Sequence, residues 1–226
     1  MTTCPASSAS DEVVQRVRDN LAVVRARIAS SGRETQSVRI VAVTKTFGAE
    51  MVRAARAAGL DDVGENYVEE LTEKRAATPD VQVVWHYLGA LQTNKIAQVT
   101  KVADVLCGVS RLKELDKIAS HRPGMALYVQ VDYTAAPGRN GAAPGDVASL
   151  VSRARALDLD VRGLMTVAPV DPELARRAFV ATDLLASDLG LVERSMGMTD
   201  DLEIACRCGS TEVRVGRALF GPRAKK

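Results

Sequence analysis

Two hydrophobic patterns alternate along this chain. Short runs of branched apolar residues predict buried strands, and the stretches between them carry apolar residues every three or four positions, as on one face of a helix. A further helix is predicted over residues 11–30, ahead of the first strand, because its apolar residues share one face. The expected strands are 38–44, 60–63, 82–88, 103–107, 125–131, 161–165, 192–196 and 212–216.

Residues that start and end helices fall between these strands. Ser10 is a predicted N-cap for the first helix, Ser110 precedes another, and Asp171-Pro172 opens a long helix that Gly190 ends. Strands that alternate with helices pair in parallel, and eight such units favour a closed (β/α)8 TIM barrel. We therefore predict an α/β protein with one barrel domain over residues 1–226 and an extra N-terminal helix. An open doubly wound sheet is the alternative.

Composition narrows the classes of partner. The 226 residues carry a formal net charge of +2, which provides no strong field for nucleic acid or an acidic membrane. The first ten residues lack the basic and apolar regions of a secretory leader, and no apolar run is long enough to span a membrane. We expect a cytoplasmic protein with reduced cysteines. Cys206 and Cys208 form a C-x-C, but His86 and His121 offer no ligand spacing, so no metal site is predicted.

Polar residues recur where the predicted strands end. The first strand, VAVTK, ends in Lys45, and a cation there must face solvent or a ligand because an unpaired buried ammonium is costly. Asn66 follows the second strand, His86 lies in the third and Met165 ends the sixth. Each residue alone has an ordinary explanation, such as a surface lysine, a helix N-cap or a core histidine. Their convergence on the carboxyl ends of barrel strands predicts a ligand site.

The end of the chain adds a candidate anion site. Gly209, Ser210 and Thr211 precede the eighth strand, Gly216 follows it, and Ser195 ends the seventh. Glycines allow the backbone to approach an anion, and hydroxyl and N–H groups bind its oxygens. Barrels often hold phosphate at the loops of strands seven and eight, so a phosphate-bearing ligand is predicted.

A lysine that faces a phosphate site suggests a Schiff base with a phosphorylated carbonyl compound. Pyridoxal 5′-phosphate fits, and so does a sugar phosphate in a class I aldolase. Arg214, on the eighth strand, favours the first, because an arginine could face the pyridine nitrogen. A guanidinium stays protonated and cannot supply the proton that makes this ring a strong electron sink. The cofactor would then be held but weakly activated.

These motifs together resemble the pyridoxal phosphate homeostasis proteins of the YggS/PROSC family, which look like the barrel domain of alanine racemase. The resemblance covers nearly the whole chain, through VAVTKT, GENYVEEL, WHYLGALQTNK, RGLMTVAP, SMGMTDD and GSTEVRVGRALFG. It implies that Lys45 carries the aldimine and Asn66 flanks the cofactor. It further implies that Ser195, Thr211 and the backbone at Gly216 bind the phosphate, and that Arg214 meets the ring nitrogen. The implied role is intracellular storage or delivery of the cofactor, with apo-enzymes as possible recipients.

Three positions depart from the family pattern. Ala90 stands where histidine is usual, Phe47 where a second lysine often follows the aldimine lysine, and Arg139 where the family has lysine. Movement of the cofactor between several lysines is therefore in doubt. The rival function is a racemase-like enzyme, which needs an acid/base on each face of the cofactor; strong catalysis is not expected. Sparse aromatic residues, 4% of the chain, favour a monomer.

Overall fold

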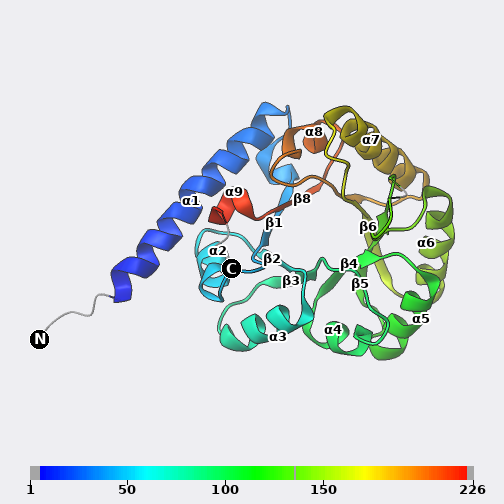
Figure 1. The fold of residues 1–226 in the computed structure, drawn as a ribbon, viewed down its shortest axis with the longest axis horizontal. Coiled ribbons are helices and arrows are strands. Elements are labelled where there is room, and N and C mark those ends of the chain that lie inside the picture. The colour runs from blue at the N-terminus through cyan, green and yellow to red at the C-terminus, as the bar shows by residue number, and fades with distance from the viewer. Residues whose placement is uncertain (1–5, 135, 223–226) are drawn as a thin grey trace, which may run out of the picture.

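Eight parallel strands close into a barrel in the computed structural model, which describes residues 6–134 and 136–222. Each strand pairs with the next, and β1 pairs with β8 to complete the ring (Figure 1). The predicted TIM barrel is confirmed, and the open-sheet alternative is wrong. The strands are β1 (Arg39–Val43), β2 (Asp62–Glu65), β3 (Val84–Tyr87), β4 (Val105–Val109), β5 (Ala126–Val131), β6 (Asp160–Thr166), β7 (Glu193–Ser195) and β8 (Glu212–Val215).

Helices surround the barrel on its outside, as Figure 1 shows. One α-helix follows each strand along the chain, which is the arrangement that right-handed crossovers between parallel strands produce. Within the described part of the chain, no helix has the length and apolar character needed to cross a membrane. The helices after the first strand are α2 (Glu50–Ala57), α3 (Val68–Ala77), α4 (Ile96–Val102), α5 (Leu112–His121), α6 (Val147–Ala156), α7 (Pro172–Asp188), α8 (Leu202–Arg207) and α9 (Arg217–Phe220).

Two strands are shifted as a whole, by two residues, toward the C-terminus of their predicted ranges. β2 spans Asp62–Glu65 rather than 60–63, and β4 spans Val105–Val109 rather than 103–107. Leu60 is buried, but its backbone N–H bonds to Ala55 and closes the end of α2. Ala103 likewise follows α4. Burial is shared by strands and helix ends, so a hydrophobic pattern alone could not separate them.

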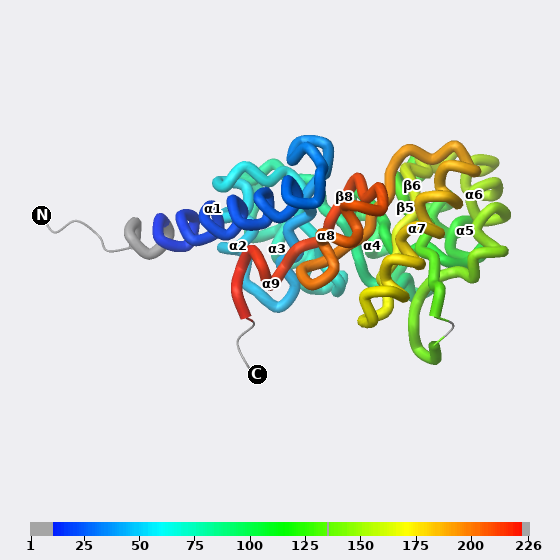
Figure 2. Tube along the Cα trace, turned by 90° about the horizontal axis from the view of Figure 1, so that it is seen from above, coloured from blue at the N-terminus to red at the C-terminus, as the bar shows by residue number. Residues whose placement is uncertain are grey.

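The N-terminal helix α1 (Ala6–Ser30) packs along one side of the barrel and extends to that side in Figure 2. Val17, Leu21, Val24 and Ile28 are buried, as the spacing predicted. The predicted N-cap, Ser10, lies inside the helix, which begins earlier than the first charged residues suggested. Helix α1 also contacts α9.

Two polar side chains of α1 bond to loops at the carboxyl end of the barrel. Arg27 donates to the Thr199 carbonyl at 2.8 Å and pairs with Glu203 of α8 at 2.6 Å. Asn20 donates to the Leu219 carbonyl in α9 at 2.8 Å. Helix α1 therefore fixes the segments that follow β7 and β8.

Helix starts agree with the sequence signals in one case and differ in another. Asp171 caps α7, and its carboxylate accepts from the backbone N–H groups of Glu173 at 3.0 Å and Leu174 at 2.9 Å. At α5, Ser110 is not the cap. Instead Glu114 accepts from the N–H groups of Ser110 and Arg111, at 2.8 and 2.9 Å. A carboxylate in the first turn thus replaces the expected hydroxyl.

We expect Asp171→Ala to lower the free energy of unfolding by about 1 kcal/mol, because two N–H groups at the start of α7 lose their acceptor. Urea denaturation followed by circular dichroism measures this change. Asp188→Ala, at the other end of the same helix, is the matched control. It removes a carboxylate from an end where negative charge is unfavourable, so it should not destabilise the protein. Equal losses for both variants would contradict the capping role.

Candidate functional site

A cavity of about 460 Å³ opens at the carboxyl ends of the strands. Its size lies within the range of roughly 300–1,000 Å³ that is typical of small-molecule sites. Segments from both ends of the sequence form it, because closure of the barrel brings β1 beside β8. The lining residues are Val43, Lys45, Asn66, Leu88, Met165, Val167, Met198, Thr199, Asp200, Arg214, Gly216, Arg217 and Pro222.

Five of the eight predicted site residues line this cavity. Lys45 follows β1, Asn66 follows β2 directly, Met165 lies near the end of β6, and Arg214 and Gly216 lie at the end of β8. Gly216 has a structural reason, since a Cβ atom there would lie 3.0 Å from the Val43 carbonyl oxygen. The barrel thus brings together a lysine, an amide, a thioether and an arginine.

Arg214 is held rigidly at the floor of the cavity. Its side chain is almost fully buried and donates to the Ser195 carbonyl at 2.6 Å, the Ser195 hydroxyl at 2.7 Å and the Thr166 carbonyl at 2.8 Å. Burial lowers the pKa of Arg214, while the nearby carboxylate of Glu212 acts in the opposite direction. Three hydrogen bonds from one planar fork fix the direction of the guanidinium.

The charged lining residues suit an anionic ligand. Lys45, Arg214 and Arg217 are three cations, and Asp200 is the single carboxylate among the lining residues that the structure describes. The formal excess is therefore two positive charges. Arg217 pairs with Asp200, with 2.6 Å between Nη2 and Oδ2, and both side chains are more than half exposed. An exposed pair contributes little stability and can exchange partners.

Thr211, which was predicted to bind a phosphate, does not line this cavity. It precedes β8, and the register pairs the first residue of β8, Glu212, with the first residue of β1, Arg39. Its hydroxyl accepts from the Arg194 N–H at 2.8 Å. The loop that precedes a barrel strand lies at the opposite end from the loop that follows it.

Ser195 also does not line the cavity. It ends β7 as predicted, but its side chain is fully buried between Arg214 and Glu212. Its hydroxyl accepts from Arg214 at 2.7 Å and donates to Glu212 at 2.6 Å. Both of these hydrogen bonds join it to residues of β8. Its side chain supports Arg214 from below.

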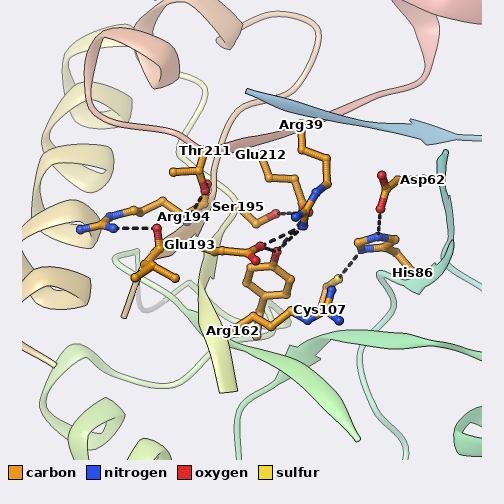
Figure 3. A network of polar contacts seen from close by, with 12 residues as sticks. Arg39, Asp62, His86, Cys107, Arg162, Glu193, Arg194, Ser195, Thr211 and Glu212 are labelled. Carbon is orange, nitrogen blue, oxygen red and sulfur yellow. Dashed lines mark hydrogen bonds and ion pairs between the residues drawn. The ribbon is translucent and has the colours of Figure 1, made fainter. Parts of the chain in front are cut away.

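His86 points into the barrel interior and is also absent from the cavity lining. It is fully buried, with Nε2 2.8 Å from Asp62 and Nδ1 3.7 Å from the Cys107 thiol (Figure 3). Burial raises the pKa of Cys107 well above its usual value, so this thiol stays protonated. The ordinary explanation, a hydrogen-bonded core histidine, fits His86 better than cofactor contact.

Sequence reasoning missed Thr199 and Arg217, which both line the cavity. Thr199 lies in the loop after β7, and its hydroxyl accepts from the Ala218 N–H at 3.4 Å. Arg217 follows Gly216. Both lie after a strand rather than before it, so strict use of the carboxyl-end rule would have selected them in place of Thr211.

The described residues provide no metal-binding cluster. No group of three or more histidine, cysteine or acidic side chains in 6–134 and 136–222 is arranged to hold an ion. Cys206 is buried and Cys208 is partly exposed, and both carry free thiols. Cys4 lies outside the described residues.

Comparison with known proteins relates this cavity to a family. Residues 14–224 match the family "Alanine racemase, N-terminal domain". A pyridoxal phosphate homeostasis protein of Pseudomonas aeruginosa is 37% identical over 220 residues, which cover 92% of this chain and 96% of that protein. The protein of that name from Deinococcus radiodurans is 38% identical over 205 residues, with coverages of 88% and 97%.

Solved structures agree with these sequence matches. PipY of Synechococcus elongatus PCC7942, solved with PLP bound, is 30% identical with a TM-score of 0.78, and covers 88% of this chain and 100% of its own. Alanine racemase from Streptomyces lavendulae is 22% identical, with a TM-score of 0.72. The match covers 92% of this chain but 57% of the enzyme, and at this identity it supports the fold alone. By sequence and by fold, this chain belongs to the pyridoxal phosphate homeostasis proteins, within the alanine racemase N-terminal domain family.

Proposed function

We propose that this protein binds pyridoxal 5′-phosphate through an aldimine to Lys45 and serves as a carrier that stores or delivers the cofactor. The observation that carries the proposal is the presence of a lysine, a buried arginine and a cationic rim in one cavity. A relative of similar length, PipY, has been solved with PLP bound, which supports the same ligand here.

The aldimine requires an amine close to the ligand's aldehyde. The Lys45 Nζ would add to the aldehyde carbon, and one water molecule would leave as the C=N bond forms. The linkage is reversible by hydrolysis. A carrier needs such a bond because it retains the cofactor and still permits release.

Arg214 would face the pyridine nitrogen and restrain the chemistry of the ring. Its three hydrogen bonds to Ser195 and Thr166 hold it in one orientation. A guanidinium does not donate its proton to pyridine, so the ring remains a weak electron sink. Asn66 and Met165 would then contact the ring from the cavity walls. Such a site retains its ligand without strong activation.

The phosphate group would lie between the loops that follow β7 and β8. Thr199 offers a hydroxyl, Gly216 allows close approach of the backbone, and Arg217 offers a guanidinium that it now shares with Asp200. A phosphate monoester carries about −1.5 to −2 charges near neutral pH, which complements the cationic lining. A dianion can therefore compete with Asp200 for Arg217.

A racemase-like enzyme is the rival. Racemisation needs proton donors and acceptors on both faces of the cofactor. The described lining residues include Lys45 but no tyrosine, histidine or cysteine, and the one carboxylate among them, Asp200, lies beside Arg217, which we place at the phosphate and not at the ring. These residues do not supply a second acid/base, which supports binding over turnover.

Transfer between several lysines receives no support at position 47. Phe47 packs against Phe220, with ring centroids 5.6 Å apart, and so contributes to the hydrophobic core. Arg139 donates at 2.6 Å to the carbonyl of Val167, which lines the cavity. It provides charge there but no primary amine. We therefore propose that Lys45 alone forms the covalent bond.

We expect the purified protein, supplied with pyridoxal 5′-phosphate, to show a visible aldimine band that Lys45→Ala abolishes. Borohydride treatment should fix the ligand on Lys45 in the wild-type protein, as peptide mass spectrometry would show. Lys101→Ala, which changes an exposed lysine of α4, is the control. A Lys45→Ala variant that retained the band would refute the assignment.

Arg217→Ala should weaken binding of pyridoxal 5′-phosphate by roughly fivefold to tenfold, because one charge-assisted contact to the phosphate is lost. Affinity for pyridoxal, which has no phosphate, should not change. Absorbance titration with both ligands measures the two values. Arg207→Ala, an exposed arginine outside this cavity, is the matched control. Equal weakening for both ligands would exclude a phosphate contact.

Loaded protein incubated with L-alanine or other amino acids should produce no more D-isomer than Lys45→Ala does, because a second acid/base is missing from the described lining. Chiral chromatography over hours of incubation measures this. Turnover at rates typical of enzymes, above about 1 per second, would make the racemase-like function the better one.

A further inference from the structure

A buried lysine lies beneath the loop that carries Lys45. Lys74, on α3, is only 5% exposed, and its ammonium group makes three contacts. It donates to the Thr44 carbonyl at 2.7 Å, to Glu65 Oε1 at 2.6 Å and to Glu70 Oε2 at 3.1 Å. The first of these contacts reaches the peptide bond directly before Lys45.

The two carboxylates extend these contacts to both sides of Lys45. Glu65 Oε1 accepts from the Thr44 hydroxyl at 2.5 Å. Glu70 Oε2 accepts from the backbone N–H of Thr46 at 2.8 Å. The residue before Lys45 and the residue after it are therefore tied to the same ammonium group. We refer to Lys74, Glu65 and Glu70 as the brace.

Thr46 has a backbone conformation that needs such support. Its φ angle is +69°, in the left-handed region. A β-branched residue is unfavourable there, and such residues persist where surrounding contacts impose them. Two contacts do so here: the Glu70 bond to the Thr46 N–H, and the Phe47 N–H bond to the Thr44 carbonyl at 3.0 Å.

The brace is poorly suited to a purely stabilising role. Burial raises the pKa of Glu65, although hydrogen bonds from Lys74 and Thr44 offset part of this effect. Its second oxygen, Oε2, is buried and has no hydrogen-bond partner within the described structure. Apolar residues of the same volume often stabilise a core as well as a buried ion pair does. The geometry that the brace imposes on residues 44–46 is its distinguishing feature.

We propose that Lys74 is a positioning residue which, through Glu65 and Glu70, fixes the backbone on both sides of Lys45 and so directs the Lys45 amine into the cavity. The proposal rests on the proposed function, because the direction of Lys45 matters for a covalent bond to an aldehyde. Lys74 itself does not contact the ligand, since it is absent from the cavity lining.

Two ligands separate positioning from general support. Pyridoxal 5′-phosphate can form the imine, whereas pyridoxine 5′-phosphate has the same ring and phosphate but no aldehyde. Glu70→Ala releases the Thr46 N–H and should weaken binding of the aldehyde by about tenfold, while affinity for pyridoxine 5′-phosphate changes by less than about twofold. Titration followed by absorbance and calorimetry measures both affinities.

Glu69→Ala is the matched control. It removes a carboxylate from the neighbouring position of α3, where Glu69 is exposed and pairs with Lys95 at 2.6 Å. This variant should leave both affinities unchanged. If Glu70→Ala weakens both ligands equally, or neither, the brace does not position Lys45 and the proposal is wrong.

A second variant tests Lys74 directly without leaving an unpaired buried charge. The double variant Lys74→Met, Glu65→Gln removes the ion pair, and the glutamine still accepts from the Thr44 hydroxyl. It should show the same selective loss for the aldehyde ligand. Urea denaturation would confirm that the double variant folds. Unchanged selectivity would overturn the role of Lys74.

In parallel, Lys45→Ala must abolish the preference for the aldehyde. If it does not, the proposed function itself fails, and this result is distinct from failure of the brace alone.

Discussion

Charged groups that are buried inside the barrel, such as Glu212 and Arg214, must be paired, because water cannot solvate them there. Arg39 pairs with Glu193 at 2.9 Å and lies 3.4 Å from Glu212 (Figure 3). The Tyr128 hydroxyl donates to Glu193 and lies 3.1 Å from Glu212. Ser195 links Glu212 to Arg214. This chain of contacts runs from the amino end of the strands to the floor of the cavity. The orientation of Arg214 therefore depends on residues at the opposite end of the barrel.

The sequence predicted the fold well, because the alternation of strands and helices is a local property. Each of the eight predicted strands overlaps an observed one, and the shifts at β2 and β4 arise where helix ends are as buried as strands. Lys45, Asn66 and Gly216 were found for a similar reason. A polar residue or glycine that directly follows a strand can be recognised from the strand's end alone.

Three predicted site residues do not line the cavity, because their positions depend on more than the end of a strand. Thr211 was assigned to the wrong end of the barrel because a Gly-Ser-Thr motif looks the same before a strand as after it. Ser195 and His86 occupy strands whose residues alternate between the interior and the helices, and the sequence does not say how deep in the interior each one lies. The partners that fix their roles, Glu212 and Asp62, are 17 and 24 residues away in the chain.

The closure of β1 on β8 sets the order in which a newly made chain can acquire its site. Lys45 emerges from the ribosome long before Arg214 and Arg217, and α1 waits for the later residues before it can contact Thr199 and Leu219. An incomplete chain presents a lysine on an open sheet with no arginine opposite it. Contacts that join residues so far apart form late and together. Ligand binding would then report completion of the whole barrel, and a bound ligand would stabilise the closed ring against opening between its first and last strands.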